Sequence, residues 1–182
     1  MCKIIYGDKV NLCHLDSFNL TEYLKVYKHS SVFAKLYESN NDFWHIQEKS
    51  IKNIKNDEER YLIIEKKSGQ YCGIVECVLT KGIIPEMNIM VSPEYRRNGY
   101  GFEASKIICN KVLGSQNHDI IIWNTFSSNI ASCRIAEKLG GIKVNADNFV
   151  ASALNEAFQD DKTKNHEVID NIIDTITYEI KY

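Results

Sequence analysis

The sequence predicts a mixed α/β fold of the α+β kind, in which helices pack on the faces of a sheet. Three consecutive β-like runs, at residues 61–65, 71–80 and 84–91, are separated by short turns that favour an antiparallel meander. An amphipathic helical segment at 101–113 and a strongly apolar β-like run at 118–125 follow. This strand-helix-strand unit should cross over right-handed, which makes its two strands parallel.

The N-terminal third supplies the elements before the meander. Residues 3–13 are β-rich and are interrupted by a Gly-Asp turn, and residues 17–28 carry apolar side chains at helical spacing. The stretch 32–57 indicates a second, mostly helical region. We therefore expect a strand and then two mostly helical regions ahead of the central strands.

The C-terminal third is less regular. A helix should run from cap candidates at 127–129 to Lys138, and short strands are expected at 142–144 and 175–181. Helical patterns at 148–158 and 166–174 predict a partly helical insertion near 145–174, before the last strand. Because no repeat or linker divides the chain, residues 1–182 are expected to form a single domain.

Composition excludes several classes of protein. The formal charge is −2, so no global basic field predicts binding to nucleic acid or to an anionic membrane. The apolar runs are shorter than the ~18 residues of a membrane helix, and no signal-type segment opens the chain, so a cytoplasmic protein is expected. The scattered histidines predict no metal site, and the six cysteines are expected to be reduced thiols.

The segment between the third strand of the meander and the next helix is typical of an anion site. It reads Arg96-Arg97-Asn98-Gly99-Tyr100-Gly101, so two glycines can let a phosphate approach the main chain while the helix N-terminus offers free N–H groups. Two arginines add positive charge. The alternative is a surface turn with solvated arginines. P-loop and GxGxxG patterns are absent.

The same six residues match the pattern Q/R-x-x-G-x-G/A, after a V-x-P-x-Y-R turn. A second block reads N-x-x-S at residues 129–132 and closes with E-K-L-G at 137–140. In this order and spacing, the two blocks resemble the GNAT superfamily of N-acetyltransferases. The N-x-x-S form is similar to the branch that contains ribosomal-protein N-terminal acetyltransferases. The resemblance covers the chain from about Ile4 to Lys143 in element order.

The resemblance implies a GNAT-like, mostly antiparallel sheet with helices on both faces and a splayed parallel pair of strands at the cofactor site. It implies acetyl-CoA as cosubstrate and no metal. Main-chain groups would bind the pantetheine arm at Ile89, Met90 and Val91, and the pyrophosphate would be wrapped by Arg96, Arg97, Asn98, Gly99, Tyr100 and Gly101. Asn129 would contact the pantetheine or a phosphate. The alternatives are a plain core strand at 89–91 and helix capping by Asn129.

Two residues are candidates for the chemistry that the resemblance implies. Glu86 lies seven residues before Pro93, where some family members carry a glutamate that removes the amine proton; the alternative is an outward-facing carboxylate. Ser132 resembles the serine that protonates the departing thiolate in the ribosomal-protein branch; the alternative is a helix cap. Many relatives use a tyrosine for this step, and Ala136 stands at its position.

The implied reaction is acetyl transfer to a primary amine, on a small molecule or a protein N-terminus, by direct transfer in a ternary complex. Acidic residues outnumber lysines between residues 144 and 175, which would steer a cationic amine or merely form a solvated face. Residues 148–158 would cover the acceptor cleft or build a homodimer contact. The alternatives are a catalytically weak or inactive acyl-CoA-binding sensor or assembly module, and a nucleotide-binding module unrelated to CoA.

Overall fold

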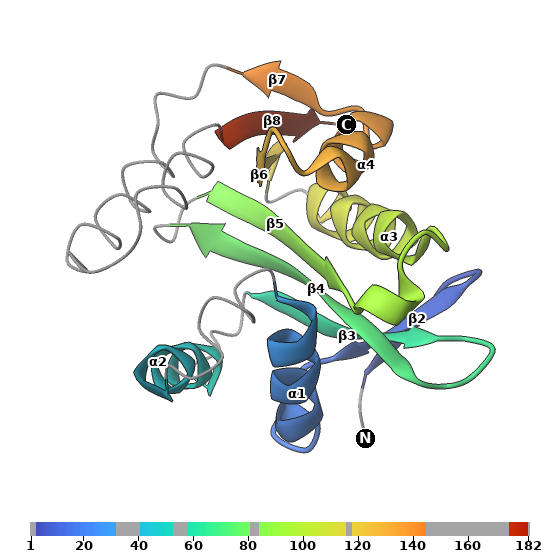
Figure 1. Ribbon diagram of the computed structural model, residues 1–182. Helices are drawn as coiled ribbons and strands as arrows, with labels where there is room; N and C mark the ends of the chain where they lie inside the picture. Colours follow the sequence, from blue (N-terminus) through green and yellow to red (C-terminus); the bar gives the residue numbers. More distant parts are fainter. Residues whose placement is uncertain are drawn as a thin grey trace. The chain divides into compact units, whose positions relative to one another are not determined.

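The computed structural model (Figure 1) describes residues 3–31, 41–52, 58–80, 84–115, 118–144 and 175–181. They belong to two compact units, Met1–His118 and Asp119–Tyr182. The predicted helical insertion at 145–174 lies outside the described residues. No helix in the described part of the chain has both the length and the apolar character needed to span a membrane.

The first unit contains an antiparallel sheet of five strands. In spatial and chain order these are β1 (Ile4–Tyr6), β2 (Val10–His14), β3 (Glu59–Glu65), β4 (Tyr71–Thr80) and β5 (Ile84–Val91). The predicted meander is therefore confirmed. Within this unit β5 is the last strand of the sheet and pairs with β4 alone.

Two helices cover opposite faces of this sheet. Strand alternation sends Ile74 and Glu76 of β4 toward α1 (Leu20–Ser30), where Tyr23 contacts both. The intervening residues point the other way, toward α3 (Tyr100–Gly114), whose Cys109 lies near Cys77. The two faces are called the α1 face and the α3 face below.

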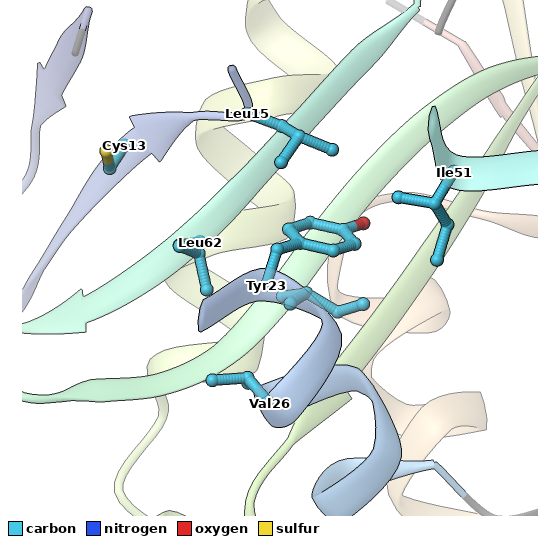
Figure 2. Close-up of a cluster of buried hydrophobic side chains, with 7 residues drawn as sticks. Cys13, Leu15, Tyr23, Val26, Ile51 and Leu62 are labelled. Atoms are coloured by element: carbon cyan, nitrogen blue, oxygen red, sulfur yellow. The ribbon is translucent and has the colours of Figure 1, made fainter. Parts of the chain in front are cut away.

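The α1 face holds an apolar core. Figure 2 shows the ring of Tyr23 among side chains from β2, β3 and α1, with Ile51 reaching it from α2 (Asn41–Lys52). Helix α2 lies inside the predicted helical stretch, of which residues 32–40 and 53–57 lie outside the described residues. Tyr23 is fully buried and Ile51 is nearly so, which fixes both helices to the sheet through the hydrophobic effect.

The second unit contains β6 (Ile120–Phe126), α4 (Ile130–Lys138), β7 (Ile142–Val144) and β8 (Thr175–Lys181). Strand β8 pairs antiparallel with both β6 and β7. Alternate residues of β6, including Trp123, are buried. All four elements fall where the sequence places them.

The cysteines depart from expectation at one position. Cys72, Cys77, Cys109 and Cys133 are free and buried. Cys13, however, forms a disulfide. The expectation that all six cysteines are reduced is therefore wrong for Cys13. The sequence offered no spacing signal for this bond.

Candidate active site

The arginine-glycine segment forms a tight turn between β5 and α3. A short 3₁₀ turn, η1 (Pro93–Tyr95), leads into it. Arg97 then takes a φ of 65° and Gly99 a φ of 84°, both in the left-handed region. Left-handed residues alternating with ordinary ones curl successive N–H groups inward, which is the geometry of an anion-binding nest. Arg96, Arg97, Asn98 and Gly99 are exposed to solvent.

Two side chains of the turn hold its shape. Arg96 Nε donates a hydrogen bond to the carbonyl oxygen of Val91 at 2.9 Å. The side-chain amide of Asn98 donates to the carbonyls of Tyr95 and Arg96, each at 3.2 Å. The nitrogen of the Asn98 amide is thus used inside the turn, so its side chain braces the main chain that would face a phosphate.

Helix α3 opens directly from this turn without a side-chain cap. Gly99 is the N-cap residue and has no side chain with which to cap the first N–H groups. The first intrahelical bond runs from the N–H of Glu103 to the carbonyl of Gly99 at 3.1 Å. The positive end of the helix dipole therefore lies beside the two arginines, an arrangement that favours an anionic group.

The two glycines of the motif play different parts. Gly99 has a left-handed φ, which residues other than glycine rarely adopt. Gly101 instead lies inside α3, is buried, and is not among the residues with a positive φ. Arg97 takes the second left-handed position, and no sequence signal identified it.

The β1–β2 hairpin is hydrogen-bonded to the turn and to the first turn of α3. Glu103, in the first turn of α3, accepts hydrogen bonds from the N–H groups of Lys9 and Val10 at 2.8 and 3.2 Å. Lys9 Nζ also donates to the carbonyl of Asn98 at 3.3 Å. These partners are about half the chain apart in sequence, so sequence reasoning missed both Lys9 and Glu103.

Tyr100 faces away from the turn. Its residue is only 8% exposed, and its hydroxyl donates a hydrogen bond to Glu65 on β3. The hydrogen bond to Glu65 raises the pKa of Tyr100 to about 12. Only the main chain of Tyr100 is left to contact a bound phosphate.

Helix α1 is tied to the start of the turn. The hydroxyls of Ser30, at the end of α1, and Ser92, just after β5, are 2.9 Å apart and buried. Beside them His29 lies 3.1 Å from a carboxylate oxygen of Glu94. The turn therefore rests on β5, the hairpin and α1 together.

The three residues predicted to bind the pantetheine arm end β5, and all are half-buried. Met90 packs against the apolar core of the α1 face, and the carbonyl of Val91 already accepts from Arg96. The side chain of Met90 thus serves the core. Their main chain lies on the strand that ends the sheet of this unit.

Glu86 lies on β5 directly opposite Val78. Its position in the alternation puts it on the α1 face, together with Asn88 and Met90. The side chain is half-buried rather than fully solvated. A proton acceptor at this position would act on a group that lies on the α1 face.

Asn129 and Ser132 belong to the second unit. Asn129 is the N-cap of α4, because its side-chain oxygen accepts from the N–H of Ser132 at 3.2 Å. The hydroxyl oxygen of Ser132 accepts from the indole N–H of Trp123 at 2.9 Å. That bond leaves the Ser132 proton available to donate elsewhere. The serine is half-buried, and Asn129 is exposed.

Ala136 and two cysteines restrict the chemistry. Ala136 stands where many relatives carry a tyrosine. It is fully buried and has no hydroxyl group to offer. Burial raises the pKa of the Cys109 thiol to about 12, and Cys133 is 7% exposed with its thiol near the carbonyl of Phe126. Neither thiol has the exposed, electropositive surroundings of a nucleophile.

The arrangement in the first unit fits a diphosphate ester of an extended thiol carrier. An uncapped helix start, two exposed arginines and a nest of N–H groups match a diphosphate. The adjoining strand end offers main-chain groups to the amides of the carrier. Among the residues that the structure describes, no three His, Cys, Asp or Glu side chains gather as metal ligands do.

Comparison with known structures gives the same fold. An acetyltransferase of the GNAT family from Bacillus anthracis superposes with a TM-score of 0.65 at 14% identity, over 98% of each chain. A GCN5-related N-acetyltransferase from Brucella melitensis gives a TM-score of 0.65 at 17% identity, over 100% of this chain and 79% of that one. Ribosomal-protein-S5-alanine acetyltransferase from Vibrio fischeri gives a TM-score of 0.62 at 12% identity, over 78% of this chain and 84% of that one.

Sequence comparison is more direct. No match was found among curated protein sequences. The profile of the acetyltransferase (GNAT) domain matches residues 15–142, which include the arginine-glycine turn, Glu86 and the N-x-x-S block. That match extends over most of the chain and reaches into both units. The chain therefore belongs to the GNAT acetyltransferase family.

Proposed function

We propose that this protein transfers the acetyl group of acetyl-CoA to a primary amine, with both substrates bound at once. The observation that carries the proposal is the turn in which Arg97 and Gly99 adopt left-handed conformations just before the uncapped start of α3. Family membership supports acetyl transfer in general. We propose further that the two units together form one catalytic domain.

The residues would share the work as follows. Arg96, Arg97 and the main chain from Asn98 to Gly101 hold the pyrophosphate, and the end of β5 pairs with the amides of the pantetheine arm. Asn129 contacts the same arm with the amide group that its capping bond leaves unused. The thioester of acetyl-CoA supplies an activated acetyl carbon with a good leaving group.

Glu86 and Ser132 would move the protons. Glu86 accepts a proton from the ammonium form of the acceptor, which frees the nitrogen lone pair. A nitrogen-carbon bond forms and the carbon-sulfur bond breaks, and Ser132 donates its proton to the departing thiolate while the second proton lost by the attacking nitrogen passes to the Ser132 oxygen. Its oxygen is held by Trp123, so the hydroxyl is already oriented. Alignment of amine and thioester supplies much of the rate.

A second candidate function is binding of acyl-CoA without turnover. The observation that favours it is the buried Ala136, which stands where many relatives carry a tyrosine that protonates the thiolate. Measurement of thiol release from acetyl-CoA across a panel of amines separates the two functions. We expect turnover with at least one amine. A chain that binds acetyl-CoA but releases no thiol with any amine at any pH supports the binding module instead.

The donor can be tested separately from the acceptor. Isothermal titration calorimetry with CoA, ATP and NAD compares the carrier with nucleotides that lack the pantetheine arm. We expect CoA to bind more tightly than either nucleotide. Equal affinity for all three would support a nucleotide-binding module and contradict the assigned pantetheine strand.

A further inference from the structure

A buried carboxylate on the α1 face is only partly used by the protein. Glu76 of β4 is 6% exposed, which is rare for a glutamate. Its oxygen Oε1 accepts from the hydroxyl of Tyr23 and from Arg60 Nη1, the latter at 2.8 Å. Among the described residues no hydrogen bond to its other oxygen, Oε2, occurs.

The side chain of Asn88 lies on the same face, across from this carboxylate. Asn88 of β5 is the direct cross-strand partner of Glu76. Side chains of such a pair begin about 5 Å apart on the same face. Asn88 is half-buried, and its side chain makes no hydrogen bond to the described residues. Asparagine is disfavoured within strands, so local folding preferences do not account for this residue.

The amide and the carboxylate lie beside the proposed base. Glu86 is two residues before Asn88 on the same strand and the same face. At about 3.3 Å per residue, the two positions are about 6.6 Å apart along β5. An extended acceptor whose amine meets Glu86 would therefore present its second amide group near Asn88, because a peptide advances by about 3.5 Å per residue.

The charge balance determines which group fits there. Glu76 already pairs with Arg60 at 2.8 Å, and Arg60 also pairs with Glu58 at 3.1 Å. A second cation, as in a polyamine, would have to lose its water to reach this buried carboxylate, and that desolvation cost offsets much of the attraction between the charges. A neutral amide gains more, because its N–H can donate to Glu76 Oε2 and its C=O can accept from Asn88.

Resting on the proposed function, we propose that Asn88 and Glu76 form an acceptor subsite that binds a neutral amide behind the reacting amine. Asn88 is the specificity-determining residue of this subsite, and Glu76 is held in place by Tyr23 and Arg60. The favoured acceptor is then an amine followed by amide groups rather than a plain alkylamine or a diamine.

The test compares three acceptors of equal length: a dialanine amide, an alkylamine and an α,ω-diamine. We expect Asn88→Leu, a replacement of similar size without hydrogen-bonding groups, to lower kcat/KM for the dialanine amide about tenfold or more. The value for the alkylamine should stay within about twofold, because that acceptor makes no bond to the lost group. Dividing variant by wild type cancels differences in acceptor basicity.

A second variant gives the opposite change. Asn88→Asp introduces a second carboxylate next to Glu76, which attracts the far ammonium group of the diamine, so it should increase the relative use of the diamine severalfold. The unfolding transition and CoA affinity of both variants show whether the fold is intact; a leucine suits a half-buried strand position.

Three outcomes count against the subsite. If Asn88→Leu lowers kcat/KM equally for all three acceptors, or for none of them, the proposed subsite is wrong while the acetyltransferase proposal stands. If Asn88→Leu fails to fold and Asn88→Asp shows the acceptor preference of the wild type, the subsite is again wrong. If the wild-type protein acetylates no amine, the proposed function itself fails and the subsite fails with it.

Discussion

The hydroxyl of Tyr23 on α1 donates a hydrogen bond to the buried carboxylate of Glu76 on β4. Burial of Tyr23, and then the charge of Glu76, raise its pKa well above the usual value, so the phenol remains a donor at any ordinary pH. This contact fixes the helix to the sheet at the face where the proposed base Glu86 lies. The position of α1 thus depends on a polar bond inside an apolar core.

Tyr23→Phe should therefore destabilise the protein. The variant leaves the carboxylate of Glu76 with Arg60 alone, and loss of a hydrogen bond to a charged group costs about 1.5–3 kcal/mol. The free energy of unfolding from urea titrations measures the loss. Tyr6→Phe is the matched control, because Tyr6 is 75% exposed. Equal stability of the two variants would mean that the bond to Glu76 contributes nothing.

Gly99→Ala should weaken CoA binding, whereas Gly69→Ala should not. Both glycines have a positive φ, 84° and 70°, so an alanine at either position costs about 1–2 kcal/mol of stability. Only Gly99 belongs to the proposed phosphate turn, and we expect its variant to lose about tenfold in CoA affinity. Calorimetry measures both affinities. Similar affinities in the two variants would remove the turn from the CoA site.

Most of the fold could be predicted because its signals are local. Strand β4 and strand β5 have the predicted bounds, since alternation and turn residues identify them without reference to other segments. Helix α3 begins one residue before the predicted start, at Tyr100, because the N-cap is Gly99. The arginine-glycine turn was predictable for the same reason, as a short motif between a strand and a helix.

The missed features depend on contacts between distant residues. Glu103 supports the turn through its hydrogen bond with Lys9, and Asn88 lies across from the buried Glu76 on the neighbouring strand. Neither pairing leaves a pattern in the sequence. The left-handed Arg97 is likewise imposed by its surroundings, because arginine does not prefer that conformation. Tertiary contacts of this kind follow only from the strand register and the helix packing.

Cys109 gives the protein a measurable dependence on alkaline pH. Burial raises the pKa of its thiol from 9.0 to about 12 in the folded state. Above about pH 9 the unfolded chain loses this proton and the folded chain keeps it, so stability falls as pH rises toward 12. Between about pH 8 and about pH 10, the free energy of unfolding of Cys109→Ala should fall by about 1 kcal/mol less than that of the wild type. Urea titrations at both values measure the difference; parallel losses would contradict it.

Ser132→Ala should affect both stability and turnover. The indole N–H of Trp123, which is 1% exposed, loses its acceptor, at a cost of about 1–3 kcal/mol. If Ser132 also protonates the thiolate, kcat should fall about 10²-fold. Ser132→Thr keeps a hydroxyl and should retain most of the stability and most of kcat. Steady-state kinetics with a fast acceptor amine separates the roles, and an unchanged kcat in a folded Ser132→Ala protein would leave Ser132 as a partner of Trp123 only.

Glu86→Gln should slow turnover mostly near neutral pH. There the acceptor is largely an ammonium ion and must lose a proton before it attacks the thioester, whereas at high pH the free amine is already abundant. The wild-type and variant pH-rate profiles should therefore separate at low pH and converge as pH rises. Glu22→Gln, an exposed carboxylate on α1 paired with Lys25, is the control and should follow the wild type throughout. Profiles of Glu86→Gln and wild type that overlay at every pH would show that Glu86 does not take the proton, and the base would then have to be water or a group of the acceptor itself.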